Sequence, residues 1–497
     1  MKLKTLCEGA GLNCADRDGD LDVSCIVSDS RRAVADCMFV CVCGLHTDGH
    51  AYIPEAVARG ARWIVVREGF DVDTTLDVTY FFVKDTRVAL AYLLDTWYEN
   101  PCKRLKLIGV TGTNGKTTVT HMIRQLLVDQ GHTCGLIGTL GCFSKERIEV
   151  TEYDDPRANM TTPDSEILYR VLARMVEDGM EYVAIEASSH ALALGKLAPM
   201  HFEVGVFTNL TPEHLDFHTD MTDYANTKAT LFEKSRVSVI SFDSPWADTM
   251  QRRAKGTVVG CSTKDETNTF YASRITLLGG RGVSYTLSTP HGEMELFCPI
   301  AGAFSVINSV QALAVCMTLG LEPNILKGSL SRISGVSGRM ERVELDADFD
   351  VLIDYAHTPD ALQNLLQTAR ECRRTGGRVI LLFGCGGDRD RTKRPVMGNI
   401  ASRYADYVIV TSDNARSEDK ESIIREILKG YSFRTPCTVI IDRKKAIEHA
   451  ILTAKKHDVI LLAGKGHEAY EIDADGKRPF SEGEIVRQAH AKRIKAD

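Results

Sequence analysis

Residues 112–118 combine the residue types that bind nucleotide phosphates, in the order Gly112-Thr113-Asn114-Gly115-Lys116-Thr117-Thr118. Glycines let main-chain N–H groups close around phosphate oxygens. Lys116 can reach the β- and γ-phosphates of a nucleotide, and the Thr117 hydroxyl suits Mg²⁺. The strict pattern would have glycine where Val110 stands, so an ordinary glycine-rich turn is the alternative. We predict a nucleotide-binding loop.

Such a loop requires a strand before it and a helix after it. Residues 105–110 are a short apolar run, typical of a buried parallel strand. Residues 119–127 carry apolar side chains at helical spacing, so the positive end of a helix would face the phosphates. This context favours nucleotide binding over a simple turn.

Two candidate metal ligands follow later predicted strands. Glu186 ends the apolar run 182–186, where open α/β sheets bind ligands, and could bind Mg²⁺ beside the γ-phosphate. A helix-capping or salt-bridged glutamate explains that position equally well. His214 follows the strand-like run 204–209 and could bind a second metal, although a lone histidine is more often structural.

A lysine and an asparagine also have two interpretations each. Lys228 shares a helical face with Tyr224 and Phe232, which suggests partial burial, a lowered pKa and a nucleophilic amine. From the residues alone, a lysine that extends its ammonium to solvent is favoured. Asn308 could recognise an adenine edge, but asparagine also suits a helix N-terminus.

Length and composition limit the class of protein. At 497 residues the chain is too long for one core, and about 150 residues per domain suggests three domains. Its 44% hydrophobic and 26% charged residues are typical of a soluble globular protein, and its net charge of −7 argues against a nucleic-acid partner. It has neither a signal peptide nor a run of membrane-spanning length, so we expect a cytoplasmic location.

The fifteen cysteines are scattered and include no Cys-x-x-Cys pair. Cys37, Cys41 and Cys43 are the most closely spaced, and a metal site there is one interpretation. Buried reduced thiols are the favoured one.

Polar loops follow the apolar runs of the last third, at residues 378–383, 407–411 and 459–463. Loops at the carboxyl ends of parallel strands converge, so we expect Arg389, Arg416 and Glu468 to share a cleft. Two guanidiniums and a carboxylate suit a ligand that carries both carboxylates and an ammonium, whereas a surface charge network is the alternative.

Motifs along nearly the whole chain together resemble the Mur ligases, the ATP-dependent amide-forming enzymes of peptidoglycan synthesis. They include TGTNGKTT at 111–118, EASSHAL at 186–192, FTNLTPEHLDFH at 207–218, YANTKATLF at 224–232, DYAHTPDAL at 354–362, GGDRDRTKRP at 386–395, DNAR at 413–416 and GKGHE at 464–468. The closest similarity is to the branch that forms UDP-MurNAc-tripeptide.

The resemblance implies an α/β protein of three domains. These are a small N-terminal α/β domain that binds the UDP-sugar (1–101), a central P-loop-type parallel-sheet ATPase domain (102–337) and a C-terminal Rossmann-like domain that binds the amino acid (338–497). The implied reaction adds meso-2,6-diaminopimelate to the D-Glu γ-carboxylate of UDP-MurNAc-L-Ala-D-Glu through an acyl phosphate, with ATP and two Mg²⁺ ions. The implied enzyme is a monomer without nucleic-acid or membrane partners. An L-lysine-adding or other Mur-like ligase is the alternative.

The same resemblance implies four groups of site residues. The ATP contacts are Gly112, Thr113, Asn114, Gly115, Lys116, Thr117, Thr118, Asn308, Arg339 and Asp354. The metal ligands are Thr117, Glu186, His214 and Lys228 as a carbamate, and the catalytic set is Lys116, Glu186, His214 and Lys228. The UDP-MurNAc-dipeptide contacts are Ser30, Leu45, His46, Thr47, Thr161, Thr162, Ser188 and Lys196. The diaminopimelate contacts are Arg389, Asp413, Asn414, Arg416, Gly464 and Glu468.

Three positions depart from the family pattern. Ala415 replaces the proline of Asp-Asn-Pro-Arg, so the loop loses a fixed φ angle. Leu194 and Lys196 stand where many relatives have glutamine and arginine, and lysine cannot supply a bidentate fork.

A nucleotide-binding protein without catalysis is a further alternative, but it would have little use for the metal-binding set.

Overall fold

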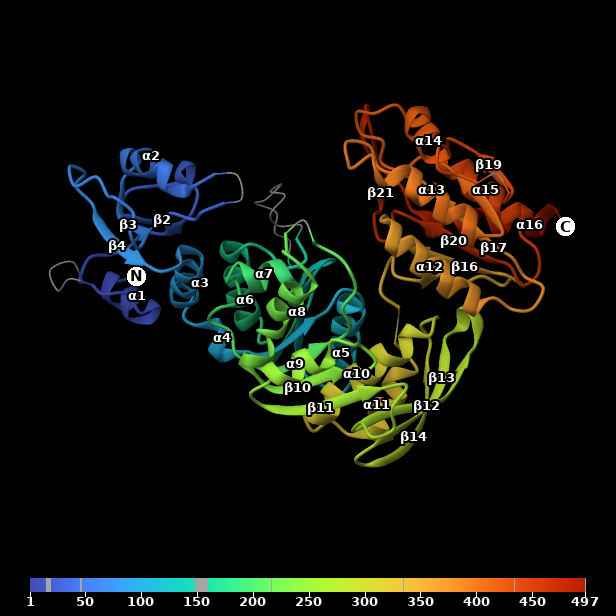
Figure 1. Cartoon of the computed structure of the whole chain (residues 1–497), viewed down its shortest axis with the longest axis horizontal. Coiled ribbons are helices and arrows are strands. Elements are labelled where there is room, and N and C mark those ends of the chain that lie inside the picture. The colour runs from blue at the N-terminus through green and yellow to red at the C-terminus, as the bar shows by residue number, and fades with distance from the viewer. Residues whose placement is uncertain are drawn as a thin grey trace. The chain divides into compact units, whose positions relative to one another are not determined.

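The computed structural model describes residues 1–14, 19–44, 47–146, 148, 160–215, 217–333, 335–432 and 434–496. The chain forms two compact units, residues 1–261 with 311–321 and residues 262–310 with 322–497. Within the described residues, no helix combines the length and apolar character that crossing a membrane requires. Figure 1 labels the elements, and each unit is described by itself below.

The first sheet has four parallel strands in the order β1-β2-β3-β4. They are β1 (Ile26–Val27), β2 (Cys37–Val40), β3 (Ala61–Arg67) and β4 (Thr79–Val83). Alternate residues point to opposite faces, so Met38 and Trp63 pack with α1 (Leu3–Ala10) and α3 (Thr86–Trp97). On the other face, Phe39 and Ile64 pack with α2 (Ile53–Ala58), which Figure 1 shows on the side away from α1.

The central sheet of the first unit places β5 (Lys106–Thr111) between β8 (Tyr182–Glu186) and β9 (Phe202–Phe207), all parallel. Its other strands are β6 (Cys134–Gly138), β7 (Gly141–Phe143), β10 (Ser235–Ser241) and β11 (Thr257–Ser262). Val110 pairs with Glu186, and Thr111 pairs with Phe207. The segments that follow β5, β8 and β9 therefore begin at one edge of the sheet.

One short helix precedes these central strands, and the other helices connect them. They are α4 (Pro101–Arg104), α5 (Lys116–Asp129), α6 (Ser165–Glu177), α7 (Ser189–Ala193), α8 (Met221–Ala229) and α9 (Ala247–Arg253). Leu126 and Leu127 of α5 and Leu168 and Leu172 of α6 are fully buried. Their helical spacing explains why these segments pack against the sheet.

The second unit contains an antiparallel set of strands and a six-stranded sheet. The antiparallel strands are β12 (Phe270–Leu277), β13 (Val283–Thr289) and β14 (Gly292–Cys298). After them, α10 (Phe304–Thr318) begins in this unit and continues from Gln311 in the first unit, and α11 (Pro323–Leu330) belongs to the second unit. The six-stranded sheet has the order β15-β16-β20-β17-β18-β19. Its strands are β15 (Glu341–Arg342), β16 (Asp350–Asp354), β17 (Val379–Phe383), β18 (Tyr407–Val410), β19 (Cys437–Val439) and β20 (Val459–Ala463).

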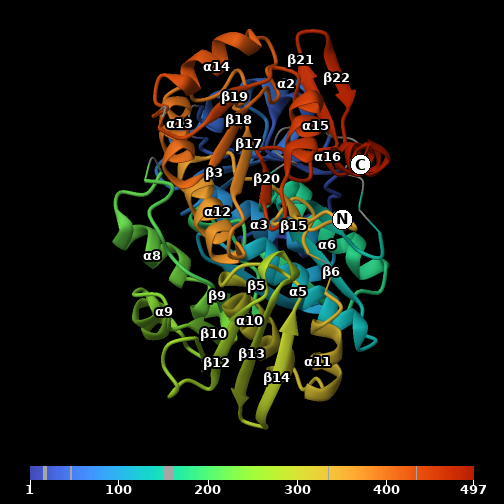
Figure 2. The ribbon, with the colours of Figure 1, turned by 90° about the vertical axis from the view of Figure 1, so that its right-hand side faces the viewer.

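Helices cover both faces of the six-stranded sheet, as Figure 2 shows for α13 and α15. One core contains residues of α12 (Pro359–Cys372), α13 (Lys393–Tyr404) and α14 (Lys420–Leu428), and the other contains residues of α15 (Arg443–Thr453) and α16 (Glu482–Ala496). Strands β21 (Tyr470–Asp473) and β22 (Gly476–Pro479) form a separate antiparallel pair. Burial on both faces explains the continuous apolar strand sequences.

The predicted fold class is confirmed, because the chain forms α/β sheets in its N-terminal, central and C-terminal parts. The central strands are mixed rather than purely parallel, since β7 pairs antiparallel with β6. The domain limits at residues 101 and 337 stay predictions.

Candidate functional site

The predicted phosphate loop lies between β5 and α5, at the sheet edge described above. Gly112 and Gly115 have φ angles of 147° and 88°, which favour glycine. A Cβ atom on Gly112 would lie 1.9 Å from the Thr208 hydroxyl oxygen, so the loop requires glycine there. Lys116 Nζ donates to the carbonyls of Gly112 and Thr113, at 3.0 and 2.9 Å. The lysine therefore already faces the concave side of the loop.

Glu186 is fully buried at the end of β8 and accepts three hydrogen bonds. The donors are Thr117 Oγ1 at 3.0 Å, Thr139 N at 2.9 Å and Thr139 Oγ1 at 3.1 Å. Burial raises the pKa of Glu186, and the Lys116 ammonium opposes that shift. Two hydroxyls and a carboxylate are hard oxygen donors, which fit Mg²⁺. Sequence reasoning missed Thr139; its signal is its place directly after β6, beside β8.

Lys228 of α8 is 1% exposed, which is deeper than the partial burial that the sequence suggests. Its Nζ donates to the Gly112 carbonyl at 2.9 Å and lies 4.5 Å from the centre of the Tyr224 ring. Burial, and next the Lys116 charge, hold the pKa of Lys228 well below its usual value. An unprotonated amine is a nucleophile for CO₂, so the site is chemically suited to a carbamate.

His214 follows β9 and has a φ of 58°, which is uncommon outside glycine. Its ring lies 4.9 Å from the His190 ring and 6.2 Å from that of Tyr224, the residue that also contacts Lys228. The structure therefore gathers His214 and Lys228 around one tyrosine.

The Thr162 and Ser188 side chains join two loops beside Glu186. Thr162 Oγ1 donates to the Glu186 carbonyl at 2.6 Å and accepts from Ser188 N at 3.2 Å. Thr161 Oγ1 lies within hydrogen-bond distance of Thr139 Oγ1, at 3.1 Å. These predicted substrate contacts therefore belong to the same hydrogen-bonded cluster as Glu186.

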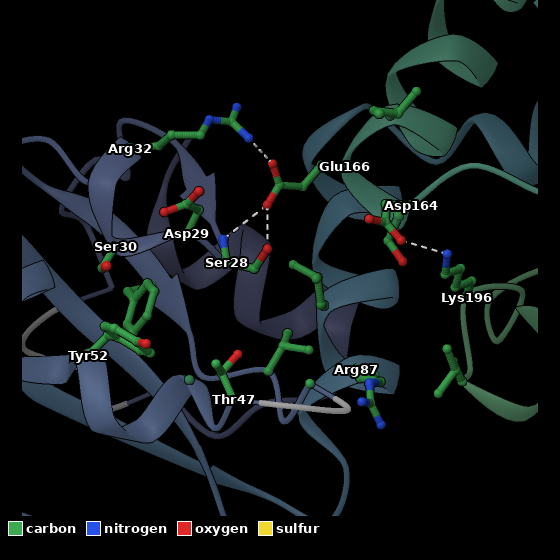
Figure 3. A pocket seen from close by; sticks show the side chains of 18 of the residues that line it. Ser28, Asp29, Ser30, Arg32, Thr47, Tyr52, Arg87, Asp164, Glu166 and Lys196 are labelled. Carbon is green, nitrogen blue, oxygen red and sulfur yellow. Dashed lines mark hydrogen bonds and ion pairs between the residues drawn. The ribbon is translucent and has the colours of Figure 1, made fainter. Parts of the chain in front are cut away.

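A cavity of about 810 Å³ opens in the first unit and includes three predicted contacts to the UDP-sugar, Ser30, Thr47 and Lys196 (Figure 3). Two further predicted contacts, Leu45 and His46, lie outside the described residues. The volume of this cavity lies in the range of small-molecule binding sites.

Several residues that line this cavity form ion pairs and hydrogen bonds with one another, as Figure 3 shows. Glu166 of α6 accepts from Ser28 N at 3.0 Å and Ser28 Oγ at 2.6 Å, and it forms an ion pair with Arg32. Lys196 Nζ pairs with Asp164 Oδ1 at 2.6 Å. Sequence reasoning missed Glu166 and its partners, because Ser28 and Glu166 lie 138 residues apart.

Three predicted ATP contacts, Asn308, Arg339 and Asp354, lie in the second unit. Asp354 ends β16 and accepts from the main-chain N–H groups of Met340 and Ala356, both at 2.8 Å. Burial raises the pKa of Asp354, and the charge of Arg339 opposes the shift. Asn308 is 3% exposed on α10. Their common role in binding ATP stays a prediction.

The loops after β18 and β20 meet around Asn414. Its Oδ1 accepts from Lys465 Nζ at 2.8 Å and from Ile472 N at 3.0 Å, so its Nδ2 donates to Glu468 Oε2 at 2.7 Å. Lys465 also lies 3.5 Å from Asp413. Sequence reasoning missed the fully buried Lys465, which stands inside the quoted GKGHE motif.

Asp413 and Gly464, two further predicted amino-acid contacts, border this group. Asp413 has a lowered pKa because the charges of Arg443 and Lys465 outweigh the effect of burial, which alone would raise it. A Cβ atom on Gly464, where φ is 115°, would lie 2.6 Å from Asp413 Oδ2. Arg389 is exposed on the loop after β17.

Arg416 is held at its main chain and its side chain. Its φ is 52°, and its N–H donates to Ile472 O at 3.1 Å. Its Nη1 donates to Gly387 O at 2.7 Å, which links the loops after β17 and β18. The neighbouring Ala415, at the position of the family's proline, is 1% exposed. Packing and hydrogen bonds therefore order this loop without proline.

Cys43, Asp48 and His50 form a group whose possible ligand atoms all lie within 4.8 Å of one another. His50 Nε2 accepts from Arg67 N at 3.1 Å, so the proton of a neutral ring is on Nδ1, which faces Asp48 Oδ1 at 2.5 Å. That nitrogen has no lone pair for a metal, and His50 is explained as a structural histidine. Cys37 and Cys41 are fully buried free thiols, as predicted, whereas Cys43, the third of that set, is a free thiol that is only partly buried.

Two family models match the chain. The Mur ligase middle domain matches residues 110–316, and the Mur ligase, glutamate ligase domain matches residues 338–466. A UDP-N-acetylmuramoyl-L-alanyl-D-glutamate–2,6-diaminopimelate ligase of Clostridioides difficile is 39% identical over 495 residues, 99% of this chain and 100% of that protein. A ligase of the same name from Caldanaerobacter subterraneus subsp. tengcongensis is 40% identical over 475 residues, 95% of this chain and 96% of that protein.

Solved structures give a similar result. A structure of a UDP-N-acetylmuramoyl-L-alanyl-D-glutamate–2,6-diaminopimelate ligase has a TM-score of 0.74 at 28% identity and covers 99% of this chain and 100% of that chain. A MurF ligase from Thermotoga maritima in complex with ADP has a TM-score of 0.59 at 18% identity, with coverage of 95% and 98%. A folylpolyglutamate synthase of Mycobacterium tuberculosis has a TM-score of 0.60 at 18% identity, with coverage of 83% and 95%. The last two comparisons show the fold alone.

Proposed function

Because this chain belongs to the Mur ligase family, and within it to the diaminopimelate-adding ligases, we propose that it joins meso-2,6-diaminopimelate to the D-Glu γ-carboxylate of UDP-MurNAc-L-Ala-D-Glu. The reaction consumes ATP and forms a peptidoglycan precursor. A carboxylate is a poor electrophile with a poor leaving group, and phosphorylation to an acyl phosphate corrects both defects. The amine of diaminopimelate then attacks, and phosphate leaves. We expect the enzyme to act as a cytoplasmic monomer.

The gathering of Lys116, Thr117, Glu186 and Lys228 at one edge of the central sheet is the observation that carries this proposal. Lys116 would leave its two carbonyl partners to bind the γ-phosphate, and would offset charge as the substrate carboxylate approaches. Glycine N–H groups and the start of α5 would hold the other phosphates.

We propose two Mg²⁺ sites in this region, one at oxygen donors and one at His214 with a carbamate. Thr117 and Glu186 would hold one ion, with Thr139 orienting the carboxylate. His214 and carbamylated Lys228 would hold the other, because a carbamate turns a buried amine into an anion that faces a metal. When bound, the ions supply charge neutralisation between the carboxylate and the triphosphate.

The amino-acid site combines an ionised Asp413, Glu468 and the Arg416 guanidinium. The carboxylates suit an ammonium group, and Arg416 suits the distal carboxylate that distinguishes diaminopimelate from lysine. Lysine would place an ammonium near Arg416 and leave the guanidinium without an anion. That difference corresponds to several kcal/mol, which is enough for discrimination above about a hundredfold.

A phosphate-release assay tests the proposal. Purified protein with ATP, Mg²⁺ and UDP-MurNAc-L-Ala-D-Glu should release phosphate only when diaminopimelate is added. L-Lysine is the matched comparison, because it lacks only the distal carboxylate. Equal rates with the two amino acids would favour a less selective or lysine-adding ligase. ATP binding without amino-acid-dependent release would favour a binding protein that lacks catalysis.

A further inference from the structure

Arg443, the first residue of α15, is 1% exposed and makes three polar contacts. Its Nη1 donates to Ser412 O at 3.2 Å, and its Nη2 donates to Ala463 O at 2.9 Å. Its Nε donates to Glu482 Oε1 at 2.8 Å, at the start of α16. One buried guanidinium therefore contacts two main-chain carbonyls and one carboxylate.

The two carbonyls stand at the bases of the loops that carry the proposed amino-acid contacts. Ser412 directly precedes Asp413, and Ala463 directly precedes Gly464. The strands that lead to these loops, β18 and β20, are not neighbours, because β17 lies between them. Arg443 therefore links two loops that no strand pairing holds together. Its planar, always charged group suits this task better than a flexible ammonium.

We propose that Arg443 is a positioning residue, which sets the distance between the two loops that bind diaminopimelate. Glu482 accepts a hydrogen bond from Arg443 Nε and so fixes the orientation of the guanidinium, which leaves both Nη groups for the carbonyls. This inference rests on the proposed function of the same site. It adds a residue that touches neither the substrate nor the reacting atoms.

A purely structural role for Arg443 predicts a different result. An ion pair that only fastened α15 and α16 to the sheet would be replaceable by two apolar side chains, because apolar replacement of a buried ion pair is often neutral. Removing Arg443 alone would not separate the two roles, since Glu482 would remain buried and unpaired. The informative variant therefore changes both residues, Arg443→Met with Glu482→Met.

Steady-state kinetics of the full-length protein, with each substrate varied in turn, tests the inference. The double variant should stay folded, with a diaminopimelate KM raised about tenfold or more, because small displacements of binding groups are costly. Its KM values for ATP and for UDP-MurNAc-L-Ala-D-Glu should remain unchanged. An unchanged diaminopimelate KM in the folded double variant would overturn the proposal.

Arg378→Met with Asp458→Met is the control, because it also replaces both members of one ion pair. Arg378 Nη2 pairs with Asp458 Oδ2 at 2.6 Å. The two residues directly precede β17 and β20, at the end of the sheet away from the loops, so losing this ion pair weakens the same sheet at a distance from them. The diaminopimelate KM of this control should equal that of the wild type, and a rise in the control equal to that in the Arg443 double variant would refute a positioning role.

If the Arg443 double variant does not fold, Arg443→Lys replaces it. Lysine keeps the charge but cannot span both carbonyls, so a wild-type diaminopimelate KM would overturn the proposal. A wild type without diaminopimelate-dependent turnover would overturn the proposed function itself.

Discussion

Replacing Lys228 by methionine should abolish turnover and remove one pH-dependent contribution to stability. Methionine fills a similar volume without an amine, so carbamate formation is lost while the packing against Tyr224 is largely kept. Lys228 is 1% exposed, and its pKa in the folded protein lies well below the 10.5 of a free lysine. The folded chain therefore carries Lys228 as a neutral amine over a range of pH.

The sign and size of the effect follow from proton linkage. Between the lowered pKa and 10.5, the unfolded chain binds one proton more than the folded chain. Raising the pH through this window therefore stabilises the fold, by about 1.4 kcal/mol per pH unit. Below the lowered pKa both states are protonated, and above 10.5 both are neutral, so the slope vanishes outside the window. The methionine variant lacks this slope.

Denaturant unfolding at several pH values tests the argument, in buffers without metal ions or carbonate. The free energy of unfolding of the wild type should rise with pH relative to the variant across the window. Parallel curves for the two proteins would refute the description of Lys228 as a buried, easily deprotonated amine. In labelled bicarbonate, a ¹³C carbamate signal should occur in the wild type and be absent from the variant.

Three further substitutions test separate parts of the site. Arg416→Met should lower kcat/KM for diaminopimelate by about 10- to 100-fold, the value of one charge-assisted hydrogen bond, and should raise the slow turnover of L-lysine, because the unpaired guanidinium that disfavours lysine is gone. An equal loss with both amino acids would contradict the assigned role. Thr139→Val removes a hydroxyl contact to Glu186, so a Mg²⁺ titration should show half-maximal rate at a severalfold higher Mg²⁺ concentration. An unchanged Mg²⁺ concentration at half-maximal rate would show that Thr139 does not contribute to metal binding. Glu166→Gln releases Arg32 from its carboxylate, so the KM for the UDP-sugar should fall about two- to fivefold at low ionic strength and recover with added salt. A rise in that KM at low salt would show that the ion pair serves binding.

Continuous local patterns allowed the fold to be predicted from sequence. The apolar run 182–186 coincides with β8, because a strand buried on both faces needs apolar residues throughout. The order of glycine, lysine and helical spacing likewise predicted a loop between a strand and a helix, and β5 and α5 flank it; its role in binding phosphate stays a prediction. Glu186 was predicted as a metal ligand from its place at a strand end, and it lies beside Thr117.

Contacts between distant segments escaped prediction, because no local pattern encodes them. Glu166 looks like a first-turn glutamate of an amphipathic helix, yet it binds Ser28 from another sheet. Arg443 looks like an exposed charge at a helix start, but it is buried beneath two loops. For Lys228, the residues alone favoured an ammonium in solvent, and only the tertiary packing shows how completely the amine is enclosed.

The Gly112 carbonyl accepts hydrogen bonds from both Lys116 and Lys228, so phosphate binding by Lys116 and carbamate formation on Lys228 both change the hydrogen bonds of this one oxygen. A phosphate that draws Lys116 away alters the field at the neighbouring amine, and a carbamate on Lys228 alters the field that Lys116 experiences. Thermodynamic reciprocity then requires that bicarbonate change the affinity for ATP by the same factor by which ATP changes the affinity for CO₂. ATP titrations at low and high bicarbonate would measure that factor, and a factor of one would mean that the two lysines act independently.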